Sequence, residues 1–243
     1  MKVRDGRATV TGTTGPGSQE LRPPRTLPNN GTHDPEEVLD VGRRPTAPAP
    51  IGVRRLLLVR HASTEATRRA AFPADEPLDA RGARDAERLA TAVPTGCEVL
   101  TSPARRCLET VHAAGLTASV EPRLAECDFG TWAGRSLEEI HAERPRDAEA
   151  WMTDPDADPH GGESLRTFAE RVATWLDEQR EADGYAVAVT HGGVVKAAVI
   201  QALAGPLESF WRVDASPLAI TELHAHGDRW TVSRVNCRRW AEP

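Results

Sequence analysis

The sequence places chemically active side chains directly after three short apolar runs. Runs of this length between polar residues are typical of strands buried on both faces of a sheet. Parallel strands end at one edge of a sheet, where ligands bind in open α/β folds, so we expect these side chains to converge. They are Arg60 and His61 after residues 56–59, Ser102 and Arg106 after residues 97–101, and His191 after residues 185–190.

This set of side chains suits a phosphoryl group. Arg60 and Arg106 carry planar guanidinium groups, which match phosphate oxygens with paired hydrogen bonds. The helices expected after Ser102 and Gly193 add backbone N–H donors at their positive ends, so the pocket offers more donors than a carboxylate can use. His61 supplies an imidazole that can act as a nucleophile or a base.

The composition argues against several classes of protein. The 243 residues carry a formal net charge of −6, whereas nucleic-acid-binding proteins usually present a basic face, so we expect no nucleic-acid partner. The four cysteines lack the paired spacing of a zinc or redox site, so we expect reduced thiols. No apolar run is long enough to span a membrane and no signal peptide is present, which predicts a cytoplasmic protein without a membrane partner.

Residues 1–52 differ in composition from the rest of the chain. Residues 1–50 contain eight of the 19 prolines, no aromatic residue and no sustained apolar period. Such a segment buries too little apolar surface to offset the entropy cost of ordering, so we predict a disordered, proline-rich extension. A passive extension is favoured over a docking tail for a partner. We assign residues 53–243 to one folded domain.

From residue 53 onward, short apolar runs alternate with helical periods. This alternation predicts an α/β fold, a three-layer α/β/α sandwich with a mostly parallel central sheet. Ser102 as N-cap, Pro103 at the first helical position and Gly115 at the end predict one helix. The other expected elements are helices around 83–93, 136–143 and 193–205, a long helix capped by Ser164, a strand at 119–121, and two or three irregular strands within 210–235.

Four motifs in this order resemble the histidine phosphatase superfamily, also called phosphoglycerate-mutase-like. The segment "VRHAST" resembles the Arg-His-Gly tripeptide that ends the family's first strand, at Arg60 and His61. The segment "SPARRCLET" is similar to the turn that carries the family's second arginine, at Arg106. "LAECDFG" and "VTHGG" are similar to the segments of its acid and its second histidine, at Glu126 and His191. The similarity covers residues 54–205.

The resemblance implies that residues 53–243 are a metal-independent phosphatase domain with the phosphoglycerate-mutase-like fold and no cofactor. His61 would attack phosphorus and form a phosphohistidine, and Glu126 would protonate the leaving oxygen and later take a proton from water. The partner implied is a small-molecule phosphomonoester. The residues implied to bind its phosphate are Arg60, Ser63, Thr67, Arg106, His191 and Gly192.

Two positions depart from the family pattern. Ala62 stands where the tripeptide has glycine, a change that matters only if the backbone there needs a positive φ. Thr67 stands where many members have asparagine, and it keeps a hydroxyl group but lacks an amide. These departures leave open a catalytically inactive phosphate-binding module as an alternative to an enzyme.

The short segment between Glu126 and Glu163 favours one branch of the family. Glu126 and Glu163 are 37 positions apart, and this compactness, with "HGGES", resembles phosphatases such as alpha-ribazole phosphatases more than the longer mutases. We therefore predict hydrolysis, with phosphoglycerate mutase-type transfer as the alternative. The sequence leaves open the substrate, the oligomeric state including a homodimer, and whether Trp132 and His160 line the pocket or pack in the core.

Overall fold

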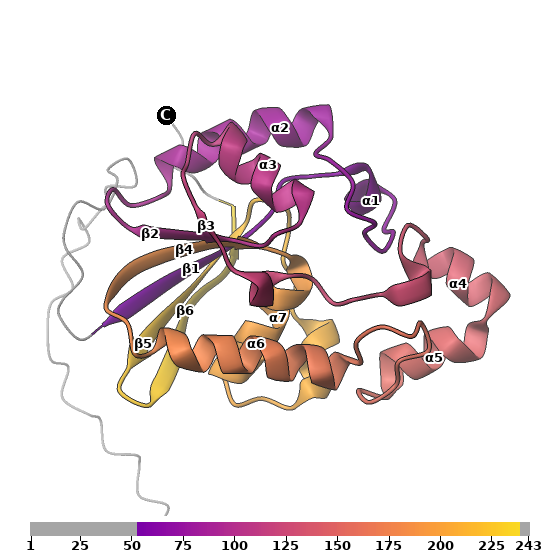
Figure 1. The fold of residues 1–243 in the computed structure, drawn as a ribbon. Coiled ribbons are helices and arrows are strands. Elements are labelled where there is room, and N and C mark those ends of the chain that lie inside the picture. The colour runs from indigo at the N-terminus through magenta and orange to yellow at the C-terminus, as the bar shows by residue number, and fades with distance from the viewer. Residues whose placement is uncertain (1–52, 239–243) are drawn as a thin grey trace, which may run out of the picture. The chain divides into compact units, whose positions relative to one another are not determined.

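A computed structural model of the chain describes residues 53–238. The predicted extension over residues 1–52 and the end of the predicted domain, residues 239–243, lie outside the described residues. The described part is a six-stranded sheet with helices on both faces (Figure 1). This arrangement confirms the predicted α/β/α sandwich with a mostly parallel sheet.

The sheet has the strand order β3-β2-β4-β1-β5-β6. Strands β1 to β4 pair in parallel with one another. Strand β5 pairs antiparallel to β1, and β6 pairs antiparallel to β5. In the central pair, Arg60 is in register with Thr190, so the residues that follow β1 and β4 emerge at the same level. The strands are β1 (Arg54–Arg60), β2 (Glu98–Thr101), β3 (Ser119–Val120), β4 (Gly184–Thr190), β5 (Ile220–His226) and β6 (Arg229–Cys237).

Two layers of helices bury the two faces of the sheet (Figure 1). Alternate residues of β1 point to opposite faces, so Leu57 and Val59 join one core while Leu56 and Leu58 join the other. Full burial of such a side chain contributes about 1.5–3 kcal/mol relative to exposure. The helices on the first face are α2 (Ala80–Ala86), η1 (Glu87–Thr91) and α3 (Arg105–Ala113), and those on the second are α6 (Leu165–Gln179) and α7 (Gly192–Ala202).

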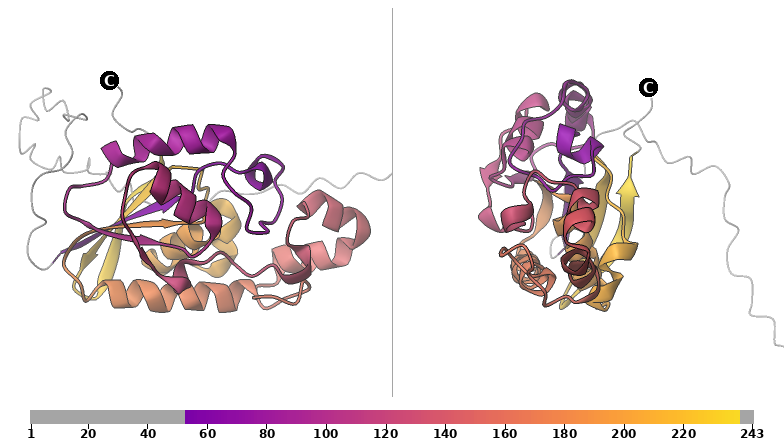
Figure 2. Two further views of the ribbon diagram at one scale, coloured as in Figure 1. Left: turned by 45° about the horizontal axis from the view of Figure 1, so that its top comes forward. Right: turned by 90° about the vertical axis from the view of Figure 1, so that its right-hand side faces the viewer.

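Further helices lie at the end of the sheet to which β1 runs, as Figures 1 and 2 show for α4 and α5. The capping box predicted for α4 is confirmed, since the N–H of Glu139 donates to Oγ of Ser136 (3.1 Å). Helix α5 was not predicted; it begins at Pro145, a residue favoured at the first helical position, but it has no side-chain cap. These elements are α1 (Glu65–Arg68), η2 (Pro122–Leu124), η3 (Gly130–Trp132), α4 (Leu137–Glu143) and α5 (Pro145–Thr153).

Two predicted elements differ from the structure. The helix expected over 83–93 is α2 followed by the 3₁₀ turn η1, although the predicted Leu89 and Val93 are buried. Two of the two or three strands expected within 210–235 are present, β5 and β6, but the region begins with a 3₁₀ helix, η4 (Leu207–Arg212), which contains Phe210. In that turn the Phe210 ring packs against Phe168 of α6, with centroids 6.5 Å apart, which buries it in the core.

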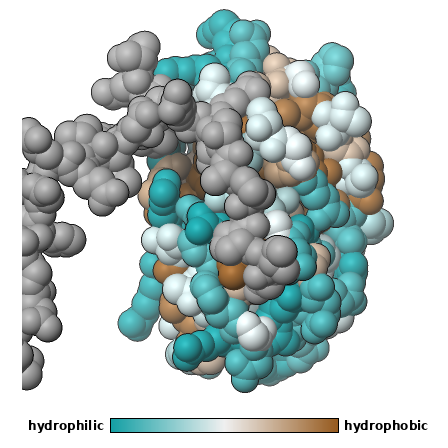
Figure 3. Space-filling view, turned by 90° about the vertical axis from the view of Figure 1, so that its left-hand side faces the viewer, coloured by the Kyte–Doolittle hydropathy of each residue, from teal (hydrophilic) through white to brown (hydrophobic). Residues whose placement is uncertain are grey.

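The opposite end of the sheet has a mixed surface. Figure 3 looks at the end where β1 begins, and there the visible described residues are largely hydrophilic with small hydrophobic patches between them. No helix within residues 53–238 is long and apolar enough to cross a lipid bilayer. The aromatic-lined cavity described below lies at the other end, beyond the carboxyl ends of the parallel strands.

Candidate active site

Three strand ends bring the predicted side chains together at one edge of the sheet. His61 follows β1, Ser102 follows β2 and His191 follows β4. The backbone N–H of His61 donates to the carbonyl oxygen of Thr190 (2.8 Å), and that of Ser102 donates to Val189 (3.0 Å). These bonds continue the parallel ladder past the strand ends, so the sheet itself sets the positions of the two histidines.

Arg106 connects the two histidines. Its Nε donates to Nε2 of His61 (3.2 Å), and its Nη2 donates to Nδ1 of His191 (3.0 Å). The side chain comes from the first turn of α3 and is 4% exposed. The centroids of the two imidazole rings are 5.3 Å apart. A permanent cation therefore lies between two imidazoles, an arrangement that attracts an anion.

The backbone fixes the tautomer of His61. Its Nδ1 lies 2.7 Å from the carbonyl oxygen of Ala62, which can only accept, so Nδ1 carries the proton. Burial, and then the charges of Arg106 and Arg60, hold the pKa of His61 well below its usual value, so the ring is neutral at physiological pH. Nε2 therefore has the lone pair that a nucleophile requires.

Ser102 holds His191 from the opposite side. Nε2 of His191 lies 2.8 Å from Oγ of Ser102, and Nε2 is the donor because Nδ1 accepts from Arg106. His191 is fully buried, and burial, followed by the charges of Arg106 and His61, holds its pKa well below the usual value. His191 is therefore a neutral, rigidly held ring.

The predicted role of Ser102 as a helix N-cap is wrong. Helix α3 begins at Arg105 with Ala104 as its N-cap residue, so Pro103 does not occupy the first helical position. Oγ of Ser102 accepts from the N–H of Ala104, the residue before the helix (3.3 Å), and its shorter contact is with Nε2 of His191 (2.8 Å). At the other end the prediction holds, since Gly115 follows the helix with φ of +63°.

Arg60 lies against the start of α7. Its Nη1 donates to the carbonyl oxygen of Ala215 (2.6 Å), and a Cβ at Gly192 would lie 3.4 Å from Cζ of Arg60. Nε of Arg60 is buried and has no hydrogen-bond partner within residues 53–238. Burial lowers the pKa of Arg60, while Glu126 and Asp214 act in the opposite direction. An anion here can satisfy both the charge and the unpaired donor.

Glu126 presents its carboxylate to the same helix start. Oε2 accepts from the N–H of Gly193 (3.1 Å), and Oε1 accepts from the N–H of Cys127 (3.1 Å). A Cβ at position 193 would lie 2.1 Å from Oε1, so the carboxylate can approach only because residue 193 is glycine. In the sequence Gly193 appeared only as part of a helix start.

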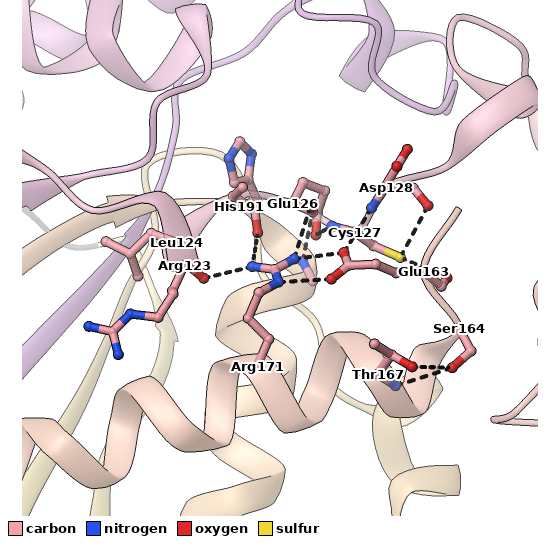
Figure 4. A network of polar contacts seen from close by, with 12 residues as sticks. Arg123, Leu124, Glu126, Cys127, Asp128, Glu163, Ser164, Thr167, Arg171 and His191 are labelled. Atoms are coloured by element: carbon pink, nitrogen blue, oxygen red, sulfur yellow. Dashed lines mark hydrogen bonds and ion pairs between the residues drawn. The ribbon is translucent and has the colours of Figure 1, made fainter. Parts of the chain in front are cut away.

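Arg171 of α6 anchors the segment that carries Glu126 (Figure 4). Its Nη1 donates to the carbonyl oxygens of Arg123 (2.7 Å) and Ala125 (3.0 Å), and its Nη2 donates to that of Glu126 (3.3 Å). The same guanidinium forms a two-pronged ion pair with Glu163 (2.7 and 2.8 Å). Sequence reasoning missed Arg171, because nothing in a helical period shows that one arginine satisfies three distant carbonyls.

Replacing Arg171 by methionine should cost stability and activity together. We expect the free energy of unfolding to fall by about 2 kcal/mol, since several charge-assisted hydrogen bonds are lost. We expect kcat to fall by up to about 10²-fold, because the Glu126 segment loses its anchor. Urea unfolding and steady-state kinetics measure both effects.

Arg166 on the same helix provides the matched control. It pairs with Asp156 at the surface, so Arg166→Met should change the free energy of unfolding by less than about 0.5 kcal/mol. Equal losses in the two variants would show that Arg171 does not hold the Glu126 segment.

A cavity of about 400 Å³ is lined by Arg60, Glu126, Gly192 and Gly193, whereas the buried His61, Arg106 and His191 are not among its lining residues. Arg60, Glu126, Lys196 and Asp214 are its charged lining residues. The aromatic residues that line it are Phe72, Phe129, Trp151, Phe168, Phe210 and Trp211. The cavity thus offers charged groups at one end and ring faces around them, as small-ligand sites commonly do.

The structure does not bring Ser63 and Thr67 to this cavity. The Ser63 hydroxyl donates to Asp79 (3.0 Å), and Ser63 lines a separate cleft beside Arg68 and Arg88. The Thr67 hydroxyl donates to the carbonyl oxygen of Thr64 (2.8 Å) in the capping box of α1. Both hydroxyls therefore serve local structure, and we leave them out of the phosphate contacts proposed below.

Ala62 fits the position where the family has glycine. It is fully buried, it is not among the described residues with positive φ, and it packs beside Ala86 and Leu218. Its N–H donates to Oγ1 of Thr110 (3.0 Å). Because the backbone is not left-handed here, the methyl group causes no strain.

Trp132 and His160 pack in the core. Both are 1% exposed and neither lines the cavity, and their rings lie 5.1 Å apart in an aromatic cluster with Trp151.

Burial raises the pKa of Cys107, which lies behind His191, to about 12, which makes it an inert thiol. Within residues 53–238, no group of three or more His, Cys, Asp and Glu is placed to hold a metal ion.

The fold and this cluster define a class of phosphoryl-transfer proteins: a mostly parallel sandwich with two histidines and two arginines at one sheet edge. Residues 56–238 match the model of the histidine phosphatase superfamily (branch 1), and the chain belongs to this family.

The chain is similar to several named phosphatases. It is 28% identical over 193 residues to phosphoserine phosphatase 1 of Hydrogenobacter thermophilus, covering 75% of this chain and 92% of that protein. It is 30% identical over 217 residues to glucosyl-3-phosphoglycerate phosphatase of Mycolicibacterium vanbaalenii, covering 74% and 96%. Among solved structures it resembles the alpha-ribazole phosphatase of Shigella flexneri, with a TM-score of 0.67, 25% identity and coverage of 78% and 99%. These similarities and the family match support phosphatase activity for this chain.

Proposed function

We propose that the chain is a metal-independent phosphatase that hydrolyses a small phosphomonoester through a phosphohistidine at His61. The observation that carries this proposal is the contact of Arg106 with both His61 and His191. This contact sets a neutral nucleophile and a phosphate-binding cation in one buried cluster. Membership of the histidine phosphatase superfamily supports the same chemistry.

In the first step, Nε2 of His61 attacks phosphorus. An N–P bond forms while the P–O bond to the leaving alcohol breaks, so the hydrogen bond from Arg106 must pass from Nε2 to a phosphoryl oxygen. Arg60, with its unpaired Nε, and Arg106 stabilise the charge on the non-bridging oxygens. The protonated carboxyl group of Glu126 gives its proton to the leaving oxygen.

In the second step, water attacks the phosphorus of the phosphohistidine. Glu126, now a carboxylate, accepts a proton from that water while the N–P bond breaks. Inorganic phosphate leaves, and His61 and the protonated Glu126 are restored. The backbone N–H groups at the start of α7, Gly192 included, add donors on the phosphate side in both steps.

The organic part of the substrate fits the larger part of the cavity. The relatives are named for activity on phosphoserine and glucosyl-3-phosphoglycerate, which are small phosphorylated metabolites. A cavity of about 400 Å³ with aromatic walls suits a ligand of that size. We therefore infer a small phosphorylated metabolite as the substrate of this chain. A cytoplasmic location stays a prediction from the sequence.

A phosphatase assay with and without a chelator tests this function. We expect the purified protein to release inorganic phosphate from p-nitrophenyl phosphate and from small phosphomonoesters at the same rate with or without EDTA. Loss of turnover in EDTA that returns with a divalent cation would contradict metal independence. Faster interconversion of 2- and 3-phosphoglycerate than phosphate release would favour the mutase alternative, and binding of phosphate without turnover would favour the inactive module.

A further inference from the structure

A second cleft lies beside Ser63, two residues after His61, and it shares no lining residue with the active-site cavity. Its volume is about 670 Å³. The protein carries a net charge of −6, yet four arginines from separate stretches of the chain line this one cleft. They are Arg68 at the end of α1, Arg81 in α2, Arg88 in η1 and Arg238 after β6. The proposed phosphatase reaction uses none of them.

Three of these four guanidinium groups are unpaired in the described part of the chain. The side chains of Arg68, Arg88 and Arg238 form no hydrogen bond and no ion pair there. Arg81 pairs with Asp85, with 3.4 Å between Nε and Oδ2, and the arginine is 81% exposed. An ion pair this exposed contributes little, so it leaves Arg81 available to a ligand with a higher charge.

Two carboxylates reduce the positive charge of the cleft without cancelling it. Among the described residues that line the cleft, Asp85 is the one acidic residue. Asp79 lies next to the cleft, where it accepts from the N–H of Gly82 (2.6 Å) and the hydroxyl of Ser63 (3.0 Å), and its charge interacts with that of Arg68. Four guanidinium groups and two carboxylates leave an excess of two positive charges, because arginine stays protonated in proteins.

One segment of chain separates the cleft from the active-site cavity. Ala215 lines the cavity, whereas Pro217 and Leu218 line the cleft. The N–H of Leu218 donates to the carbonyl oxygen of Arg60 (2.9 Å), and Nη1 of Arg60 donates to that of Ala215 (2.6 Å). The two sites are therefore neighbours in the fold but have different lining residues, so the cleft can be altered without replacing a reacting group.

We propose that this cleft binds a compact anion with two or more linked phosphates, a diphosphate or a short polyphosphate. Guanidinium forks donate paired hydrogen bonds to phosphate oxygens, and linked phosphates offer enough oxygens and charge for several forks at once. A single phosphate fills little of the 670 Å³. The described lining residues include no aromatic ring on which a nucleobase could stack, so the phosphates themselves are recognised.

Methylenediphosphonate is a suitable probe, because a phosphatase cannot hydrolyse its P–C–P linkage. We expect calorimetry at a fixed low ionic strength to detect binding to the full-length wild type. Arg68→Met and Arg88→Met should each raise the Kd by about 3- to 5-fold, the range of an exposed charged contact, and the double variant by about 10-fold or more. Citrate, which carries carboxylates in place of phosphates, should bind the cleft more weakly than the diphosphonate.

Arg146→Met is the matched control. It removes one exposed positive charge from α5, where the Arg146 side chain also has no hydrogen bond or ion pair to another described residue and lies outside the cleft. It should keep the wild-type Kd. Unchanged thermal unfolding curves would show that all the variants fold. The measurement needs no turnover, so its result is independent of the proposed function.

Four results would overturn the proposal. They are no binding to the wild type, an unchanged Kd in the double variant, an equal loss of affinity in Arg146→Met, and equal affinity for citrate and the diphosphonate. The second would place the probe at another site, the active-site cavity included. The third would reduce the effect to overall charge, and the fourth would show that the cleft does not select phosphate.

Discussion

His61→Ala is expected to abolish phosphate release, with kcat lower by about 10⁴-fold or more. The variant lacks the only side chain that forms a bond to phosphorus in the proposed reaction, so the two-step route is lost. The neutral, backbone-fixed imidazole beside Arg106 is the physical basis of this expectation. Release of phosphate from p-nitrophenyl phosphate measures the effect, with His112→Ala as the control, since His112 is exposed on α3.

The same prediction has a chemical readout. Wild-type enzyme denatured during turnover at alkaline pH, where phosphohistidine survives, should carry one phosphoryl group on the peptide that contains His61. Fragmentation of that peptide by mass spectrometry locates the phosphoryl group on the residue. Phosphate on another side chain, or turnover that continues in His61→Ala, would end the proposed mechanism.

The strand-end groups were predictable from the sequence because topology is simple to infer from short apolar runs. Residues 56–59 and 185–190 form adjacent parallel strands, so Arg60, His61 and His191 had to emerge at one edge once those strands were placed. The N-terminal part of α3 then delivers Arg106 to the same edge. Local pattern and family motif agreed at each of these positions.

The supporting contacts could not be predicted, because they join residues distant in sequence through side-chain geometry. Ser102 resembles an N-cap locally, and only the fold shows that its hydroxyl also contacts His191, 89 positions away in the sequence. Arg171 and Lys196 are ordinary charged residues of helical segments until their partners are known. The sequence therefore indicated the reacting groups, whereas the structure identifies the groups that hold or surround them.

Glu126→Gln is expected to reduce turnover of alkyl phosphates by about 10²- to 10⁴-fold, the usual contribution of a general acid. Glutamine can keep the hydrogen bond from Gly193 at this position but has no proton to give. An alkoxide is a poor leaving group and needs that proton, whereas p-nitrophenolate leaves without it. We therefore expect formation of the phosphohistidine to slow strongly for phosphoserine and only weakly for p-nitrophenyl phosphate.

The second step separates this role from a merely structural one. Hydrolysis of the phosphohistidine needs Glu126 to accept a proton from water, so Glu126→Gln should accumulate phosphate on His61 with p-nitrophenyl phosphate but not with phosphoserine. Rapid-quench measurement of the phosphoenzyme and of the p-nitrophenol burst follows both species. Asp128→Asn is the control, because Asp128 lies on the same loop and does not line the cavity. Equal losses on both substrates without a phosphoenzyme would mean that Glu126 positions the pocket and moves no proton.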